Sequence, residues 1–229
     1  GQVRTLSYEN VRTDGEVDQA VEDAVRRGAN VIFTTTPKLL LSSVRQAALH
    51  PDVKILNCSL NTSYPSVRTY YPRLYGAKFI KGAIAGTLTR DGCIGYVADY
   101  PTYGSIASIN AFAQGARMVN ANARIYLDWA HLRDGGAVGR LQAQGIVYID
   151  YLDRLAASTG TQMGNRHNLA LIQTHWGRLY QSLVRRVMEG SWKQEDQGSS
   201  AVNYWWGMEQ GVVSVLCSRR LPTGPRRLA

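Results

Sequence analysis

The sequence predicts an α/β protein with mainly parallel sheets, and two observations carry this prediction. Short apolar runs typical of buried strands alternate along the chain with longer runs in which apolar residues recur at helical spacing. These runs form two groups, separated by a polar stretch near residues 60–72. A chain of 229 residues has room for two lobes of about 100 residues each, so we expect one lobe from each group.

The first group predicts the order β-α-β-α-β. Its first helix has clear boundaries, because Thr13 and Glu16 form a capping-box pattern and Gly28 follows the last apolar position. The second helix is expected to end before Pro51, since proline cannot continue a helix. The expected strands are residues 3–8, 31–33 and 53–56, and the expected second helix is residues 38–49.

The second group repeats this alternation. Helices are expected at residues 74–88, 105–119 and 138–144, and strands at residues 93–98, 124–129, 146–149 and 167–172. A long amphipathic helix is expected at residues 176–188. The chain then ends in an extended pair, residues 202–206 and 211–216, whose turn is flanked by Gly207 and Gly211.

The beginning of the chain departs from a complete lobe of this class. A doubly wound lobe normally opens with a strand and a helix. This chain opens with what reads as the second strand, so we expect that one βα unit is absent from it or lies upstream.

The charge and the cysteine content of the chain exclude few classes of protein. The net charge is +9, but the excess is scattered over arginine pairs near helix ends or the C-terminus, which favours a soluble basic protein over a nucleic-acid-binding one. The three cysteines, Cys58, Cys93 and Cys217, form no C-x-x-C pair and are expected to be buried free thiols. No apolar stretch approaches the roughly 20 residues that cross a bilayer, and no signal peptide can be read.

Patterns typical of catalysis or metal binding are scarce. The chain contains no phosphate-binding loop, dinucleotide-binding turn or nucleophile elbow, and its histidines lack ligand spacing. We therefore expect no metal, no cofactor and no enzymatic activity. Asp150 and Asp153 could form an acid/base pair, but the same spacing at a strand end suits a solvated loop or a ligand clamp.

Polar and aromatic residues follow several of the predicted strands. Ligands of open α/β sheets bind at the carboxyl ends of strands, so these positions are candidates for a binding cleft. The alternative is that Thr and Ser cap helices and Tyr packs between the lobes. The strand-end candidates are Thr34, Thr35, Asn57, Cys58, Ser59, Asp99, Tyr100 and Tyr103.

An aromatic run, Tyr204–Trp206, lies near the end of the chain. Trp205 could form the floor of a pocket for a planar ligand, or fill a gap where segments cross between the lobes. Both interpretations stay open from the sequence.

Specific strings of the sequence resemble the basic membrane protein family of ABC-transporter solute-binding lipoproteins. The similarity extends over nearly the whole chain, and the strings occur in the family's order. They are residues 31–35, 55–59, 77–86, 94–101, 103–107, 109–113, 115–120 and 203–208.

The resemblance implies the type I periplasmic binding protein fold, in which two Rossmann-like lobes are joined by a three-segment hinge. The crossings would lie near residues 66–71, 173–176 and 198–203. The first lobe would then comprise residues 1–67 and 173–200, and the second lobe residues 68–172 and 201–229. The missing strand and helix would belong to the first lobe, just before Gln2.

The resemblance also implies the function of an ABC importer's solute-binding protein. It would be extracytoplasmic and anchored to the membrane as a lipoprotein, although neither anchor nor signal peptide is visible, and its partners would be a small solute and a membrane permease. The best-known members bind purine nucleosides, and Asn57, Asp99 and Tyr100 occupy loops that match their ligand loops. The implied site adds Asp153, His175, Trp176 and Trp205 to the strand-end candidates.

Two departures leave the solute open. Where nucleoside receptors carry an Asp-rich loop, and then a Ser and a Lys, this chain has residues 163–166 and 174–176 without an evident lysine. Two other functions also remain. The fold serves as the ligand-sensing domain of cytoplasmic transcription regulators, and an enzyme could work through Asp99, Asp150 or Asp153.

Overall fold

The computed structural model describes residues 3–99, 103–132, 136–151, 168–192 and 201–228. The chain divides into two compact units. Unit 1 comprises Gly1–Tyr71 and Gly177–Trp206, and unit 2 comprises Pro72–Trp176 and Gly207–Ala229. The chain therefore passes between the units three times. Two of these passages lie at the ends of the expected crossings, and the third lies beyond residues 198–203.

Unit 1 is built on a four-stranded sheet in the order β1-β2-β3-β8. Its strands are β1 (Val31–Thr34), β2 (Lys54–Asn57), β3 (Arg68–Pro72) and β8 (Asn203–Trp206). Strands β1 and β2 pair in parallel, with Thr34 opposite Asn57, and β3 runs parallel to β2. The carboxyl ends of β1 and β2 therefore meet at one edge of the sheet.

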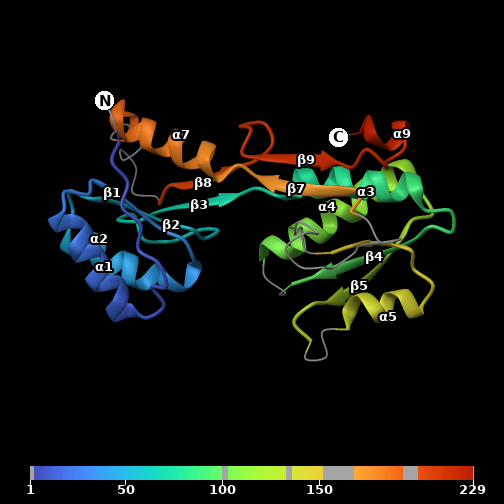
Figure 1. The fold of residues 1–229 in the computed structure, drawn as a ribbon, viewed down its shortest axis with the longest axis horizontal. Helices are drawn as coiled ribbons and strands as arrows, with labels where there is room; N and C mark the ends of the chain where they lie inside the picture. Colours follow the sequence, from blue (N-terminus) through green and yellow to red (C-terminus); the bar gives the residue numbers. More distant parts are fainter. Residues whose placement is uncertain (1–2, 100–102, 133–135, 152–167, 193–200, 229) are drawn as a thin grey trace. The chain divides into compact units, whose positions relative to one another are not determined.

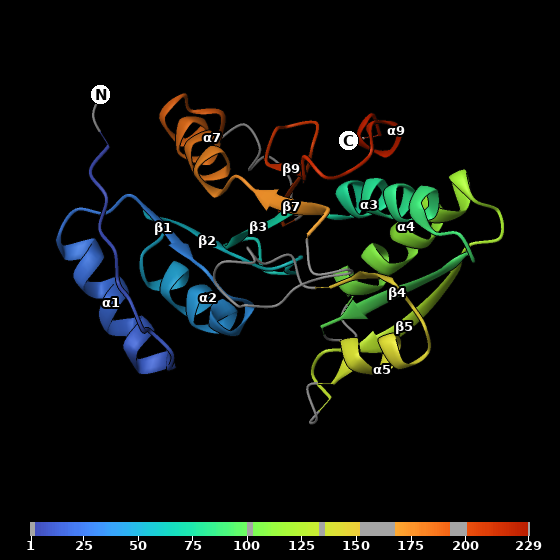
Figure 2. The same ribbon diagram turned by 45° about the vertical axis from the view of Figure 1, so that its right-hand side comes forward.

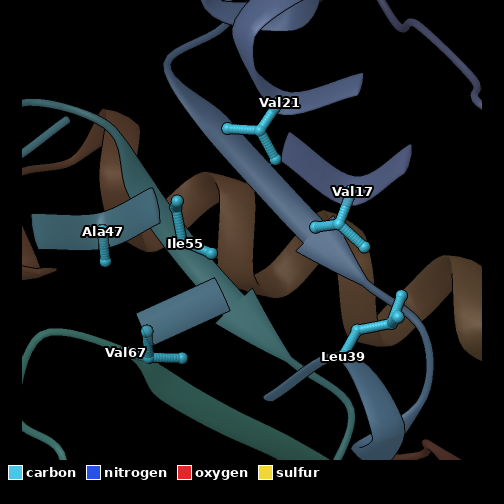
Figure 3. Close-up of a cluster of buried hydrophobic side chains, with 6 residues drawn as sticks. All are labelled: Val17, Val21, Leu39, Ala47, Ile55 and Val67. Carbon is cyan, nitrogen blue, oxygen red and sulfur yellow. The ribbon is translucent and has the colours of Figure 1, made fainter. Parts of the chain in front are cut away.

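Helices cover both faces of this sheet. Helices α1 (Asp14–Arg26) and α2 (Leu40–Leu49), with the short helix η1 (Pro37–Leu39), lie on one face, and α7 (Trp176–Met188) lies on the other (Figures 1 and 2). Between α1, α2 and the sheet, branched and small apolar side chains form a buried core (Figure 3). Its members are Val17, Val21, Leu39, Ala47, Ile55 and Val67.

The capping box predicted for α1 is confirmed. The Thr13 hydroxyl accepts from the backbone N–H of Glu16, and the Glu16 carboxylate accepts from the N–H groups of Thr13 and Arg12. These bonds satisfy amide groups that have no partner inside the helix, and they hold the pKa of Glu16 below its usual value.

The strand predicted for residues 3–8 is wrong. The chain there forms no strand, and Val3 is 57% exposed. Among the described strands β1 has β2 as its only neighbour, and residues 3–8 do not pair with its other edge. Side chains attach the segment to α1 instead, since the Tyr8 hydroxyl donates to Asp23 at 2.7 Å and Arg4 donates to the Arg27 carbonyl oxygen.

Arg68, the first residue of β3, links the sheet of unit 1 to the segment that follows α7. Its side chain is 2% exposed, and its guanidinium lies 3.5 Å from the centroid of the Trp192 ring. It donates to the Tyr204 hydroxyl at 2.5 Å and to the Trp192 carbonyl oxygen at 2.7 Å. Because Arg68 belongs to β3 and Tyr204 to β8, this arginine helps to hold the two strands together.

Unit 2 contains a three-stranded parallel sheet in the order β5-β4-β6. Its strands are β5 (Arg124–Trp129), β4 (Cys93–Ala98) and β6 (Tyr148–Asp150). Alternate residues of the central strand face opposite ways. Ile94, Tyr96 and Ala98 pack with α4 (Tyr103–Val119), whereas Val97 packs with α5 (Ala137–Ala143).

Helix α3 (Tyr75–Leu88) lies beside α4 on one side of this sheet, and α5 lies on the other (Figures 1 and 2). Glycines bring α3 and α4 unusually close together. A Cβ atom built on Gly82 would lie 2.0 Å from the Phe112 carbonyl oxygen, and one on Gly115 would lie 1.9 Å from the Phe79 carbonyl oxygen. Only glycine leaves room for this approach.

The hairpin predicted at the end of the chain is wrong. Strand β8 joins the sheet of unit 1, and β9 (Val213–Cys217) instead pairs antiparallel with β7 (Ala170–Thr174) beside α3 in unit 2. Gly207 and Gly211 do flank a turn, but that turn follows a passage between the units. A short helix, α9 (Thr223–Arg226), follows β9. Among the described helices, none has the length and apolar character of a membrane span.

Candidate functional site

The carboxyl ends of β1 and β2 hold a chain of buried hydrogen bonds. Asn57 is fully buried, and its amide nitrogen donates to the Thr34 hydroxyl at 2.8 Å and to the Thr36 carbonyl oxygen at 3.0 Å. The Thr34 hydroxyl lies 2.9 Å from that of Ser43, which donates to the Leu39 carbonyl oxygen at 2.7 Å. The strand-end residues predicted from the sequence are therefore linked to the first turn of α2.

The direction of each bond in this chain follows from the proton count. Ser43 has one hydroxyl proton and gives it to Leu39, so towards Thr34 it can only accept; the Thr34 oxygen accepts from Asn57. Both amide protons of Asn57 are used, one on Thr34 and one on the carbonyl oxygen of Thr36. A flipped amide would place two acceptors face to face at Thr36, so the orientation of Asn57 is fixed.

Two polar atoms at this edge lack a partner. Asn57 Oδ1 and Ser59 Oγ are both buried, and neither has a hydrogen bond among the described residues. Leaving a buried polar group unpaired costs about 1–3 kcal/mol, so such atoms call for a ligand or an ordered water. Their position, at the end of β2 and just after it, is where ligands of parallel sheets bind.

Cys58 lies between these two residues and is an unreactive thiol. Its backbone N–H donates to the Thr34 carbonyl oxygen at 2.8 Å, and its side chain is 8% exposed. Burial raises the pKa of the thiol to about 11. The expectation of a buried free thiol is confirmed here, whereas Cys93 and Cys217 are free but only half-buried.

The raised pKa of Cys58 predicts a loss of stability at high pH. The thiol has a pKa near 9.0 in the unfolded chain and near 11 in the folded one, so the stabilisation is complete below pH 9 and lost between pH 9 and 11. We expect Cys58 to account for up to about 3 kcal/mol of that loss. Urea unfolding measured as a function of pH checks this prediction. The fall in the free energy of unfolding between pH 9 and 11 should be smaller in Cys58→Ala than in the wild type, and unchanged in Cys93→Ala. Equal slopes in both variants would contradict the prediction.

Trp205 lies beside the same loop. Its indole N–H donates to the carbonyl oxygen of Leu60, the residue after Ser59, while 38% of its surface stays exposed. Thr34, Asn57, Cys58, Ser59 and Trp205 are therefore gathered in unit 1, although β8 is distant from β2 in the sequence. Thr35 also lies at this edge and is exposed.

Sequence reasoning missed three aromatic residues next to this edge. The Tyr70 hydroxyl donates to the Thr34 carbonyl oxygen at 3.1 Å, and its ring packs against Phe33 and Tyr180. Tyr180 was missed because the periodicity of α7 draws attention to its apolar residues only. Tyr70 was missed because the family resemblance assigns residues 66–71 to a crossing rather than to β3. Burial raises the pKa of Tyr70, so its hydroxyl stays protonated and remains a donor.

In unit 2 the predicted strand-end residues are only partly described. Asp99 follows β4 and is exposed, and its carbonyl oxygen accepts from His131 Nδ1 at 2.5 Å. Tyr103 is the first residue of α4. Tyr100 and Asp153 lie outside the described residues.

Asp150, the last residue of β6, is held by two lysines. Its carboxylate oxygens lie 2.8 Å from Lys78 Nζ and 2.5 Å from Lys81 Nζ, and all three side chains are buried. A cavity of about 70 Å³ borders this group and is lined by Lys81, Asp150 and Asn168, among other residues. Two lysines three residues apart in the otherwise apolar α3 are the sequence signal for this group, and sequence reasoning missed it.

His175 and Trp176 lie where the chain leaves unit 2. The His175 backbone N–H donates to the Val212 carbonyl oxygen at 2.7 Å, and its ring Nε2 lies 2.8 Å from the Ser214 hydroxyl. Trp176 begins α7 and is 38% exposed. Within the described part of the chain, no three His, Cys, Asp or Glu side chains are placed to hold a metal ion.

Comparison with known proteins gives a family match over most of the chain. The model of a family described as "ABC transporter substrate-binding protein PnrA-like" matches residues 2–160. A purine-binding protein of Brucella abortus is 25% identical to the chain, covering 99% of this chain and 69% of its own length. A putative ABC transporter glucose-binding protein of Haloferax volcanii is also 25% identical, but the chain spans only 56% of its length.

Solved structures show the same fold at low sequence identity. A transcriptional activator of the comK gene from Bacillus halodurans superposes with a TM-score of 0.71 and 17% identity, over 95% of this chain and 81% of its own. A solute-binding protein of an ABC transporter system from Conexibacter woesei gives 0.67 and 13% identity, over 94% and 80%. A myo-inositol-binding protein from Caulobacter gives 0.52 and 12% identity, over 96% and 83%.

The periplasmic solute-binding fold, the parallel sheets of both units and the family match over residues 2–160 agree with one another. This chain belongs to the basic membrane protein family of ABC transporter substrate-binding proteins.

Proposed function

We propose that this chain is the extracytoplasmic receptor of an ABC importer, and that its solute is a purine nucleoside or a related polar aromatic molecule. The observation that carries the proposal is the group of unpaired polar atoms and a half-exposed indole in unit 1. Asn57 Oδ1 and Ser59 Oγ need hydrogen-bond partners, and Trp205 offers an aromatic surface next to them.

A planar solute with polar groups suits this group of residues. An indole held by its N–H to Leu60 presents its ring without rotating freely, which favours stacking on a base. The name of the Brucella relative points to purines, and that of the Haloferax relative to a sugar. A nucleoside contains both chemical groups.

The remaining candidate residues would act from unit 2. Asp99 follows β4, Tyr103 begins α4, and His175 and Trp176 adjoin a passage between the units, while Tyr100 and Asp153 are candidates from the sequence. A solute that contacts both units binds one arrangement of them more tightly than another, and only such differential binding can drive closure. The permease would then recognise the closed form, and a lipid anchor would keep the receptor at the membrane.

Thermal unfolding with adenosine, adenine, glucose and myo-inositol tests the proposal. A true ligand at 100 times its dissociation constant stabilises the folded protein by about 2.7 kcal/mol. We expect adenosine to raise the melting temperature most and to be recovered unchanged, because the proposed role is binding without turnover. Hydrolysis of adenosine would instead favour an enzyme.

Substitution of Trp205 tests the proposed site. Trp205→Ala should weaken adenosine binding at least about tenfold, whereas Trp205→Phe should retain most of it, because phenylalanine keeps a stacking ring and loses only the N–H bond to Leu60. Isothermal titration calorimetry gives the dissociation constants. Equal losses in the two variants would show that the bond to Leu60 matters and stacking does not.

A further inference from the structure

We infer that the solute binds unit 1 through hydrogen-bond donors, with a hydroxyl or N–H group directed at Asn57 Oδ1 and Ser59 Oγ. This inference rests on the proposed function and specifies the chemistry of the same site. The part of the solute facing β2 is a hydrogen-bond donor and carries no negative charge.

The side-chain amide of Asn57 has a fixed orientation. Its two protons are used by Thr34 and by the carbonyl oxygen of Thr36, which can only accept. The oxygen is therefore the one atom of this amide left for a ligand, and it can only accept. A carbonyl, carboxylate or phosphate oxygen placed there would face another acceptor without a proton between them.

The hydrogen bonds behind Asn57 agree with this polarity. The single hydroxyl proton of Thr34 has two acceptors in reach, Ser43 Oγ at 2.9 Å and the Leu56 carbonyl oxygen at 3.3 Å. With either acceptor, the Thr34 oxygen accepts from Asn57. The carbonyl oxygen of Thr36 cannot change roles. The acceptor at Asn57 Oδ1 is thus set by the fold rather than by the choice of a rotamer.

Ser59 provides the second position. Its backbone N–H donates to the Asn57 carbonyl oxygen at 3.0 Å, which holds the two residues in one tight turn. Its hydroxyl has no partner among the described residues, although the side chain is only 5% exposed. A hydroxyl can both donate and accept, so a ligand hydroxyl that donates to Asn57 Oδ1 can also accept from the Ser59 hydroxyl.

The hydrogen-bonded groups at this edge of the described sheet carry no charge, because they are the side chains of Thr34, Ser43 and Asn57 and backbone carbonyl groups. A phosphorylated solute would therefore find no cation in this set to pair with. Two parts of a nucleoside could supply the donor, namely a ribose hydroxyl or an N–H group of the base. Both have the same hydrogen-bonding chemistry, and ligand analogues separate them.

The experiment is calorimetric titration of the full chain with adenosine and with analogues that each lack one donor. The 2′-deoxy, 3′-deoxy and 5′-deoxy adenosines remove ribose hydroxyls one at a time, and purine riboside removes the amino group of the base. At least one of them should bind about 5- to 10-fold more weakly than adenosine, as expected for the loss of one neutral hydrogen bond. Adenosine monophosphate should not bind better than adenosine.

Ser59→Ala assigns the lost bond to the site. The variant should bind adenosine about 5- to 10-fold more weakly, and the gap between adenosine and the sensitive analogue should shrink to about twofold. The empty variant should melt at or above the temperature of the wild type, because it loses a buried hydroxyl that has no partner among the described residues.

Ser42→Ala is the matched control. Ser42 lies on α2 and is also buried, but its hydroxyl donates to Asp14 of α1 at 2.6 Å. Its variant should melt at a lower temperature and bind adenosine as the wild type does. This pattern is the reverse of the one expected for Ser59→Ala.

The outcomes separate the inference from the function on which it rests. If the wild type binds adenosine and every analogue equally, or if Ser59→Ala leaves all affinities unchanged, the inference is overturned and the proposed function stands. If adenosine and the other purine compounds do not bind the wild type at all, the proposed function fails, and the inference fails with it.

Discussion

Gly115→Ala is expected to lower the free energy of unfolding of unit 2 by about 3 kcal/mol or more. The new Cβ atom would lie 1.9 Å from the Phe79 carbonyl oxygen and 3.1 Å from the Ala83 nitrogen, and both belong to the backbone of α3. Overpacking against side chains typically costs about 1–3 kcal/mol, because they can turn aside. The backbone of a helix cannot turn aside in this way, so α3 and α4 must move apart along their contact.

Gly139→Ala in α5 provides the control for this prediction. Nothing lies within 4 Å of the Cβ atom that the substitution adds there, and the residue is inside a helix. Alanine should therefore stabilise the protein by up to about 1 kcal/mol. Urea unfolding of both variants, followed by circular dichroism, measures the difference. A loss below about 1 kcal/mol for Gly115→Ala would mean that the two helices are not held as closely as the structure shows.

Local patterns of the sequence predict most of the elements. The periodicity of apolar residues places α3, α7, β4 and β5 within a residue or two of their observed bounds, and the capping box places the start of α1. These features depend on residues that are close in sequence, so a local pattern can determine them.

Strand pairing could not be predicted in the same way. Residues 202–206 and 211–216 look like a hairpin, yet β8 pairs in unit 1 and β9 pairs with β7. Residues 3–8 have the composition of a strand, yet they attach to α1 through side chains and do not pair with the free edge of β1. Pairing depends on contacts with segments that can lie anywhere along the chain, so a local pattern does not determine it.

The candidate site could also be predicted only in part from the sequence. The rule that ligands bind at the carboxyl ends of strands selects Thr34, Asn57 and Ser59, and the structure gathers them with Trp205. The sequence does not show how the amide of Asn57 is fixed, because its partners act through contacts between different elements. The polarity of the site is thus a property of the fold.

The second large effect is expected for Asp150→Asn. This substitution keeps the shape of the side chain but removes the charge that faces the ammonium groups of Lys78 and Lys81. Removing one partner of a buried ion pair typically destabilises a protein by about 3–5 kcal/mol, and here two cations lose the same carboxylate. We expect a loss of that size in urea unfolding at neutral pH.

Asp128→Asn is the matched control, since Asp128 also lies on the sheet of unit 2 and pairs with Arg140 at 2.8 Å. That pair is more exposed, at 35% for the arginine side chain, and the arginine lowers the pKa of Asp128. Exposed pairs contribute about 1 kcal/mol or less, so the control should lose far less stability than Asp150→Asn.

A double variant distinguishes charge from shape as the source of this effect. If the loss in Asp150→Asn comes from two ammonium groups facing one another without the carboxylate, adding Lys81→Met should restore part of the stability, because one of the charges is removed. If the loss comes from packing or from the hydrogen bond to Lys78, the second substitution should lower stability further. Recovery in the double variant would show that the carboxylate neutralises the lysines of α3 and holds the end of β6 against that helix.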